Sequence, residues 1–175
     1  MTRAFLSLGS NLGDRLENLR SSAAALDRGT WVSVVWASKV YETEPVEVEE
    51  GHPDYLNCAV EVECGMSAVE LLRFCQGVEA ALGRDEKGSM APRTVDVDVL
   101  LFGEEEILVR DLTIPHHGIT RSFNLRCIAD LDPDLRIPGF GVVGELLKSA
   151  KLDGVREFEG AEVWRKGESA TFPET

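Results

Sequence analysis

Two kinds of hydrophobic spacing alternate along the first hundred or so residues, and their order is the strongest constraint on the fold. Strand-like segments carry apolar residues at every second position or in short runs rich in valine and aromatic residues. Helix-like segments repeat an apolar residue every three or four positions. The predicted strands cover residues 4–8, 31–41, 58–64 and 94–102, and the predicted helices cover residues 12–26 and 71–82.

The resulting order is strand, helix, strand, strand, helix, strand, which is typical of the split β-α-β, or ferredoxin-like, arrangement. We therefore expect an α+β fold in which an antiparallel sheet carries both helices on one face. Ser10 or Asn11 is the expected N-cap of the first helix. The polar stretches 42–53 and 84–92 are expected to be loops.

The length of 175 residues predicts a single domain. We place its core at about residues 3–135 and expect a C-terminal extension over residues 136–175. After Gly103 the pattern indicates irregular structure with one short helix at about residues 123–131. The last fifteen or so residues are polar and are expected to fray.

The composition excludes several classes of protein. A net charge of −13 argues against non-specific binding to nucleic acid or to an anionic membrane. No apolar run approaches the ~20 residues of a membrane-spanning helix, and the first residues lack a secretory pattern, so we expect a cytoplasmic protein. The four cysteines show no C-x-x-C spacing, which argues against a zinc site or a disulfide framework. We expect a monomer, with a dimer as the alternative.

The charges are unevenly distributed along the chain. Residues 41–64 contain eight acidic side chains and no lysine or arginine. Arg84, Lys87 and Arg93, by contrast, lie within ten residues of one another, shortly before two aspartates. Local cations beside carboxylates in an acidic protein favour a small phosphorylated ligand over a nucleic acid.

The two aspartates alternate with apolar residues in the last predicted strand. Asp96 and Asp98 are therefore expected on one face, about 7 Å apart along the backbone, where they would suit magnesium and the phosphates that it binds. The opposite, core-facing side is expected to consist of Val95, Val97, Val99 and Leu101. An isolated D-x-D on a solvated strand usually has no function. Arg93, three residues earlier, adds the kind of cation on which phosphoryl transfer relies, and this favours a metal and phosphate site.

The common nucleotide-binding motifs do not occur in the sequence. There is no G-x-x-x-x-G-K-[ST] loop and no H-R-D and D-F-G pair. The glycine-rich segment 7–15 lies between a predicted strand and a predicted helix, but it has no lysine at the P-loop position. A nucleotide would have to be bound by other means.

Six short segments follow one another in an order that is specific to one family. They are Leu8–Asp14, Tyr41–Val46, Pro53–Asn57, the Gln76 and Glu79 pair before Gly83, Pro92–Asp98 and Leu112–His116. Over about residues 3–135 the sequence resembles the 6-hydroxymethyl-7,8-dihydropterin pyrophosphokinases of folate biosynthesis. The resemblance implies a magnesium-dependent transfer of diphosphate from ATP to the pterin alcohol, which gives the pterin diphosphate and AMP.

The resemblance also implies roles for individual residues. Asp96 and Asp98 would hold two magnesium ions, and Arg84 and Arg93 would stabilise the transferring phosphates as catalytic residues. The pterin would contact Thr43, Val46, Tyr55, Asn57 and Phe123, with the two aromatic rings on either side of it. ATP, the co-substrate, would contact Gln76, Glu79, Val99, Thr113, His116 and Arg121.

The segment 84–92 departs from the family pattern. It is less basic than usual, and Met90 stands near the position of a usual tryptophan, which predicts weaker ATP binding or slower loop closure. Two other interpretations stay open. In the first, the chain is a pterin- and nucleotide-binding homologue without catalysis, which would release no AMP. In the second, it is a ferredoxin-like regulatory domain, whose ligand binding would not need magnesium.

Overall fold

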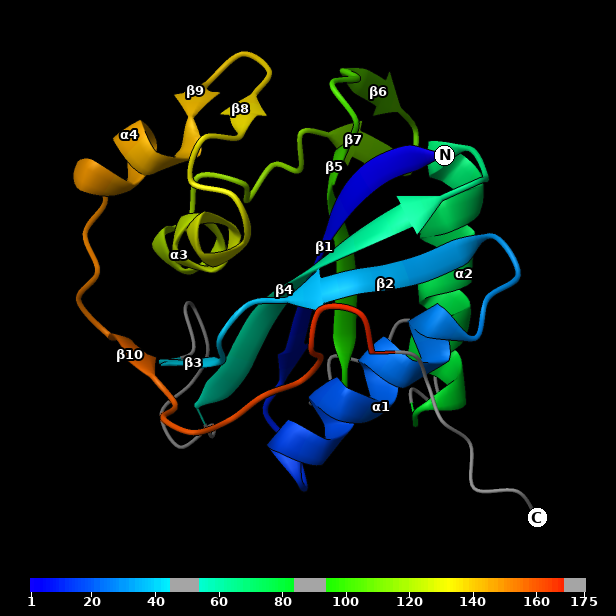
Figure 1. The fold of residues 1–175 in the computed structure, drawn as a ribbon, viewed down its shortest axis with the longest axis horizontal. Coiled ribbons are helices and arrows are strands. Elements are labelled where there is room, and N and C mark those ends of the chain that lie inside the picture. The colour runs from blue at the N-terminus through cyan, green and yellow to red at the C-terminus, as the bar shows by residue number, and fades with distance from the viewer. Residues whose placement is uncertain (45–53, 84–93, 169–175) are drawn as a thin grey trace.

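An antiparallel sheet lies at the centre of the molecule, between two pairs of helices (Figure 1). The computed structural model describes residues 1–44, 54–83 and 94–168. The strands are β1 (Thr2–Ser10), β2 (Val32–Ala37), β3 (Tyr41–Thr43), β4 (Tyr55–Cys64), β5 (Asp96–Phe102), β6 (Ile107–Val109), β7 (Leu112–Ile114), β8 (Arg136–Ile137), β9 (Gly141–Val142) and β10 (Val155–Glu157). The helices are α1 (Arg15–Asp27), α2 (Ala68–Ala81), α3 (Ser122–Leu131) and α4 (Val143–Lys148). None of these helices is long and apolar enough to cross a membrane.

The main sheet has the strand order β10-β3-β4-β1-β5, and β2 also pairs with β4. All of its pairings are antiparallel, which confirms a mixed fold of helices and an antiparallel sheet. The single strand predicted over residues 31–41 was wrong, because it is divided into β2 and β3. At the break, the Ser38 N–H donates to the Ala59 carbonyl at 2.8 Å, and the Ser38 Oγ accepts from the Ala59 N–H at 2.9 Å. A side-chain oxygen thus replaces a backbone acceptor, and the ladder is interrupted there.

Local signals fix where the helices begin. Helix α1 has Asp14 as its N-cap, whose Oδ1 accepts from the Glu17 N–H at 3.1 Å. The predicted caps, Ser10 and Asn11, were wrong because β1 continues through Ser10 and a turn with Gly13 at a φ of 66° follows. Helix α2 starts three residues before its predicted first leucine, since Ser67 and Glu70 form a reciprocal capping box.

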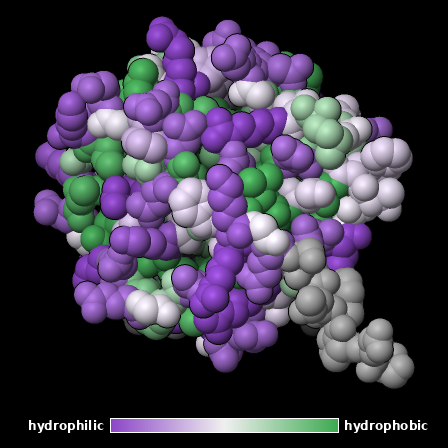
Figure 2. Space-filling view, in the orientation of Figure 1, coloured by the Kyte–Doolittle hydropathy of each residue, from purple (hydrophilic) through white to green (hydrophobic). Residues whose placement is uncertain are grey.

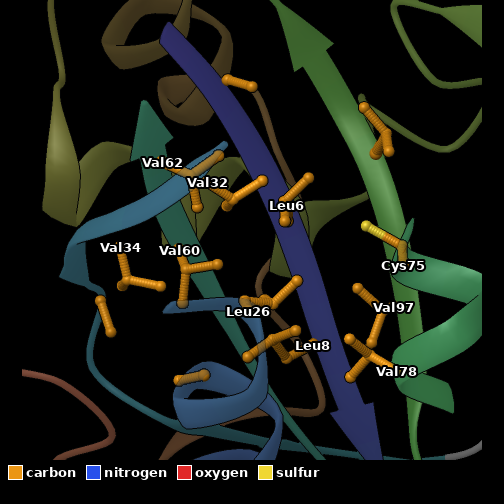
Figure 3. Packing of buried hydrophobic residues seen from close by; sticks show 14 of the residues in the cluster. Leu6, Leu8, Leu26, Val32, Val34, Val60, Val62, Cys75, Val78 and Val97 are labelled. Atoms are coloured by element: carbon orange, nitrogen blue, oxygen red, sulfur yellow. The ribbon is translucent and has the colours of Figure 1, made fainter. Parts of the chain in front are cut away.

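The larger core lies between the sheet and helices α1 and α2. Successive residues of a strand point to opposite faces, so alternate residues of β1 and β4 enter this core. Figure 3 shows strand residues packed against side chains of the two helices, among them Leu6, Leu8, Val60, Val97, Leu26, Cys75 and Val78. The two helices therefore share one face of the sheet, as predicted.

Helices α3 and α4 cover the opposite face, around a second core that includes Ile128 and Val143 (Figure 1). The short helix predicted at about residues 123–131 is confirmed as α3, whereas the irregular structure predicted for the rest of the segment after Gly103 was wrong. The segment forms α4, two small strand pairs and β10, which joins the main sheet beside β3. Fraying does not reach Val163 and Trp164, which are each 7% exposed because they pack on the larger core.

A bulge at Leu100 shifts the alternation of β5. Phe5 pairs with Leu101 and Leu6 pairs with Val99, so β1 skips Leu100. Leu101 consequently belongs to the core under α3 and not, as predicted, to the side of Val97 and Val99. The extra residue of a bulge directs its backbone away from the ladder, and the Leu100 carbonyl accepts from the His116 N–H at 2.9 Å.

The surface is predominantly polar on the face drawn in Figure 2, where hydrophobic side chains show only as separate small areas between hydrophilic ones. The most exposed large hydrophobic residues come from different parts of the chain, including Trp31, Leu108 and Phe140. Singly exposed apolar residues are normal on soluble domains.

Candidate functional site

A cavity of about 210 Å³ opens on the face of the sheet that α3 covers. The four neighbouring strands β3, β4, β1 and β5 form its floor, and the start of α3 forms one wall. Its lining consists of Ser7, Gly9, Thr43, Glu44, Tyr55, Asn57, Asp96, Asp98, Arg121 and Phe123. Seven of these residues were predicted from the sequence, although they come from four separate elements and a loop.

The carboxylates of Asp96 and Asp98 stand at one end of this cavity. Both face it because they are two residues apart on β5, and Val97 between them points into the larger core. On β1, Gly9 pairs with Asp96 and Ser7 pairs with Asp98. Small residues opposite the two acids leave room for a ligand above this part of the sheet.

His116 approaches Asp98 from the loop after β7. Its Nε2 lies 4.0 Å from the Asp98 Oδ1, and its Nδ1 accepts from the Gly118 N–H at 3.0 Å. The acceptor role of Nδ1 places the proton of the neutral ring on Nε2, on the side of the carboxylate. Burial lowers the pKa of His116 from its ordinary value and outweighs the opposite effect of Asp98, so the neutral ring is favoured.

The other end of the cavity combines an amide and two aromatic rings. Tyr55 and Asn57 share one face of β4, and the Asn57 Nδ2 donates to the Thr43 Oγ1 at 2.7 Å. Asn57 is only 6% exposed, and this bond holds its amide at the lining of the cavity, next to Gly9 of β1. Phe123 lines the cavity from α3. Such a set suits a flat heterocycle with donor and acceptor edges.

Helix α3 is fixed against the strands that form the floor. The Tyr41 hydroxyl on β3 donates to the Asp130 carboxylate at 2.7 Å, and Arg126 donates to the same carboxylate at 3.0 Å. At the other end of the helix, the Asn124 Nδ2 donates to the Gly118 carbonyl at 2.8 Å. These bonds hold the first turn of α3, with Arg121, at a set distance from the sheet.

Five predicted site residues in the described ranges do not line the cavity: His116, described above, and four others. Gln76 and Thr113 are exposed on α2 and β7, whereas Glu79 and Val99 are 5% and 2% exposed. The Glu79 Oε2 accepts from the Val97 N–H at 3.2 Å. This burial contradicts the alternative of Glu79 as part of a solvated helix face, whereas its contact with ATP stays a prediction. Glu79 holds the strand segment between the two aspartates.

Three predicted residues, Val46, Arg84 and Arg93, lie outside the described residues. Three others line the cavity without having been predicted, namely Ser7, Gly9 and Glu44. A signal for two of them was present, because Ser7 and Gly9 interrupt an otherwise apolar strand on the face that Leu6 and Leu8 do not occupy.

The donor set fits magnesium that arrives with a phosphorylated substrate. Within the described ranges, no group of three or more His, Cys, Asp and Glu side chains could hold an ion. Magnesium commonly takes only one or two carboxylates and completes its coordination with phosphate oxygens and water. Asp96 and Asp98 supply two hard oxygen donors at an accessible cavity, so they meet this requirement.

Comparison with known proteins gives a consistent result. The sequence pattern of the family described as 7,8-dihydro-6-hydroxymethylpterin-pyrophosphokinase (HPPK) matches residues 5–133. The 2-amino-4-hydroxy-6-hydroxymethyldihydropteridine pyrophosphokinase of Bacillus subtilis is 36% identical over 164 residues, which are 93% of this chain and 90% of that protein. The folic acid synthesis protein fol1 of Schizosaccharomyces pombe is 38% identical over 136 residues, which are 77% of this chain but 18% of that protein.

Solved structures show the same fold. A crystal structure of an HPPK-DHPS protein in complex with substrates superposes with a TM-score of 0.68 over 85% of this chain. The chain spans 43% of that protein, and the sequence identity is 13%. This likeness therefore concerns the fold of the shared part.

Proposed function

Because this chain belongs to the 7,8-dihydro-6-hydroxymethylpterin-pyrophosphokinase family, we propose that it transfers the diphosphate group of ATP to the hydroxymethyl group of a dihydropterin. The products would be the pterin diphosphate and AMP, on the route to folate. One observation carries the proposal: a single cavity joins a carboxylate pair suited to metal-bound phosphates with an amide and two aromatic rings suited to a pterin.

The pterin would lie between the rings of Tyr55 and Phe123, with its polar edge at Asn57. Thr43 contributes by holding the Asn57 amide through the 2.7 Å bond, and Val46, outside the described residues, is proposed to contact the same edge. The hydroxymethyl group would then point along the cavity towards Asp96 and Asp98. Alignment of the attacking oxygen with the phosphorus is a main source of rate in phosphoryl transfer.

The triphosphate of ATP would lie at the carboxylate end of the cavity. Asp96 and Asp98 would hold two magnesium ions, which would neutralise the phosphates and favour ionisation of the alcohol. Arg121 lines the cavity, and the neutral His116 would donate a hydrogen bond from Nε2. Arg84 and Arg93, outside the described residues, are proposed to stabilise the charge on the transferring group. No covalent enzyme intermediate is required.

The remaining predicted residues have more indirect roles in this proposal. Gln76 and Thr113 are exposed and do not line the cavity. They would contact the part of ATP that extends beyond the cavity. Glu79 and Val99 would act by holding β5 in place, since both side chains are buried.

We also propose finer assignments for the fold and the state of the protein. The order β2-β4-β1-β5 with α1 and α2 on one face supports the ferredoxin-like interpretation. The scattered exposed hydrophobic residues support a monomer. All four cysteines are buried and free, which agrees with a cytoplasmic location.

An AMP-release assay with 6-hydroxymethyl-7,8-dihydropterin, ATP and magnesium tests the proposed reaction. AMP should form only when the pterin and magnesium are both present. Asp98→Ala should abolish turnover and leave the circular dichroism spectrum unchanged, because the Asp98 side chain is 53% exposed and supports no packing. Calorimetric binding of the pterin without AMP release would identify a non-catalytic homologue instead.

A further inference from the structure

Strand β10 brings the C-terminal segment next to the candidate pterin pocket. It pairs with β3 in the register Val155 with Thr43, Arg156 with Glu42 and Glu157 with Tyr41 (Figure 1). The Phe158 N–H extends the contact by donating to the Val40 carbonyl at 2.8 Å. Without β10, the three-residue β3 would be an edge strand. The segment lies beyond residues 5–133, to which the family pattern is confined.

Two arginines and two acids join β10 and α1 to the adjacent ends of β3 and β4. We name this cluster of Arg15, Arg156, Glu42 and Asp54 the Glu42 clamp. The Arg156 Nη2 donates to the Glu42 Oε1 at 3.2 Å and to the Asp54 Oδ2 at 3.1 Å. The Arg15 Nη1 donates to the Glu42 Oε2 at 2.8 Å and to the Asp54 backbone carbonyl at 2.9 Å. Each arginine therefore bridges the same two residues, one from β10 and the other from α1.

The electrostatics of the clamp are favourable because the surrounding chain is acidic. Residues 41–64 carry eight acids and no lysine or arginine, so both cations must come from elsewhere in the sequence. Hydrogen bonding and charge from Arg15, with a further contribution from Arg156, lower the pKa of Glu42 despite its partial burial. Two of these acids, Glu42 and Asp54, are thus held by cations from α1 and β10.

The residues of the clamp stand beside residues that line the cavity. Thr43 follows Glu42, Tyr55 follows Asp54, and Thr43 and Tyr55 are paired in the register of β3 with β4. Both line the cavity, and Thr43 also accepts the 2.7 Å bond from Asn57. A shift of β3 relative to β4 would therefore move one aromatic wall and the bond that orients the amide.

We propose that Arg156 on β10 is a positioning residue for the pterin wall of the cavity. By holding Glu42 and Asp54 together, it fixes Thr43 and Tyr55 and so sets the affinity for the pterin, without touching either substrate. The C-terminal segment is in this view a working part of the site. This inference rests on the proposed function for the identity of the ligand.

Steady-state AMP-release kinetics of full-length variants test the inference. Because Arg156 is 55% exposed and solvent screens its pairs, Arg156→Ala should raise the KM for the pterin by about three- to fivefold. The KM for ATP and kcat at saturating pterin should stay within twofold of wild type. Arg156→Lys keeps the charge and should recover part of the loss. The matched control is Glu157→Gln, which breaks the neighbouring pair with Lys39 on the same strand and should change neither KM.

The outcomes separate this inference from the proposed reaction. An unchanged pterin KM in Arg156→Ala, or an equal rise in Glu157→Gln, would overturn the positioning role. A fall in kcat together with a rise in both KM values would indicate general destabilisation and would also overturn the positioning role. If wild type releases no AMP, the reaction is refuted, and calorimetric titration of 6-hydroxymethylpterin still compares wild type with Arg156→Ala and Arg156→Lys. Equal affinities there would count against the clamp.

Discussion

A methyl group added at Gly9 should impair pterin binding while it leaves the fold intact. Gly9 lies on β1 at the floor of the cavity, next to Asn57 and opposite Asp96. A Cβ at this position would stand 3.1 Å from the Asn57 Oδ1 and 3.8 Å from the Tyr55 Cδ1. Gly9 is part of a regular strand, so alanine suits its backbone and reduces the freedom of the unfolded chain.

The size of the effect follows from how firmly Asn57 is held. The amide would have to retreat by a few tenths of an ångström from the new methyl group. Its bond to Thr43 is already short at 2.7 Å, so retreat disturbs either that bond or the contact with the pterin edge. A neutral hydrogen bond contributes about 0.5–1.5 kcal/mol, which corresponds to a rise of about two- to twelvefold in the Kd for the pterin.

Calorimetric titration of Gly9→Ala with 6-hydroxymethylpterin, in the presence of magnesium and a non-hydrolysable ATP analogue, measures this Kd. The affinity for the analogue alone should not change, because the methyl group lies at the amide end of the cavity. Gly77→Ala is the matched control, since nothing lies within 4 Å of a Cβ built there on α2. A pterin Kd for Gly9→Ala within twofold of wild type would refute the proposed position of the ligand, as would an equal loss of affinity for both substrates.

Three further predictions concern the acids around the site. Asp98→Asn should reduce kcat by about a hundredfold or more, because a charge that stabilises the transition state is lost. Added magnesium should restore little of this activity, which AMP release measured at two magnesium concentrations checks. Glu79→Leu should lower the free energy of unfolding by about 1–3 kcal/mol, since the buried Val97 N–H loses its acceptor, whereas Glu79→Gln should lose less, as urea denaturation would show. Glu42, whose pKa is lowered in the folded state, adds stability that is present above its ordinary pKa of 4.5 and is lost as the pH falls through the folded value. The stability of wild type should therefore fall more steeply below pH 4.5 than that of Glu42→Gln, and parallel curves would contradict the pairing.

Sequence periodicity predicted that Asp96 and Asp98 share one face of a strand, whereas Tyr55 and Asn57 were expected from the family resemblance. Tyr55 with Asn57, and Asp96 with Asp98, face the cavity because residues two apart share a face of a regular strand. The same reasoning failed at Leu101, where one inserted residue at Leu100 reverses the phase. A bulge depends on how two strands meet, and the spacing within one strand carries no record of it.

Glu79 shows a second way in which the pattern was incomplete. On a helical projection it lies beside the apolar stripe of α2 and resembles a solvated residue. In the structure it is buried, because β5 presents the Val97 N–H to it. A charged side chain becomes part of a core only when a distant segment supplies its hydrogen-bond partner.

The sequence by itself determined the alternation of strand and helix segments up to about residue 102, the shared strand face of Asp96 and Asp98, and the resemblance to one family. These depend on local geometry and on short motifs. Only the tertiary structure decided that β2 and β3 are separate, that β10 joins the sheet, and that Arg156 and Arg15 meet at Glu42. The physical reason is that pairing between distant segments is selected by their packing and charge in three dimensions, and many registers satisfy the same one-dimensional pattern.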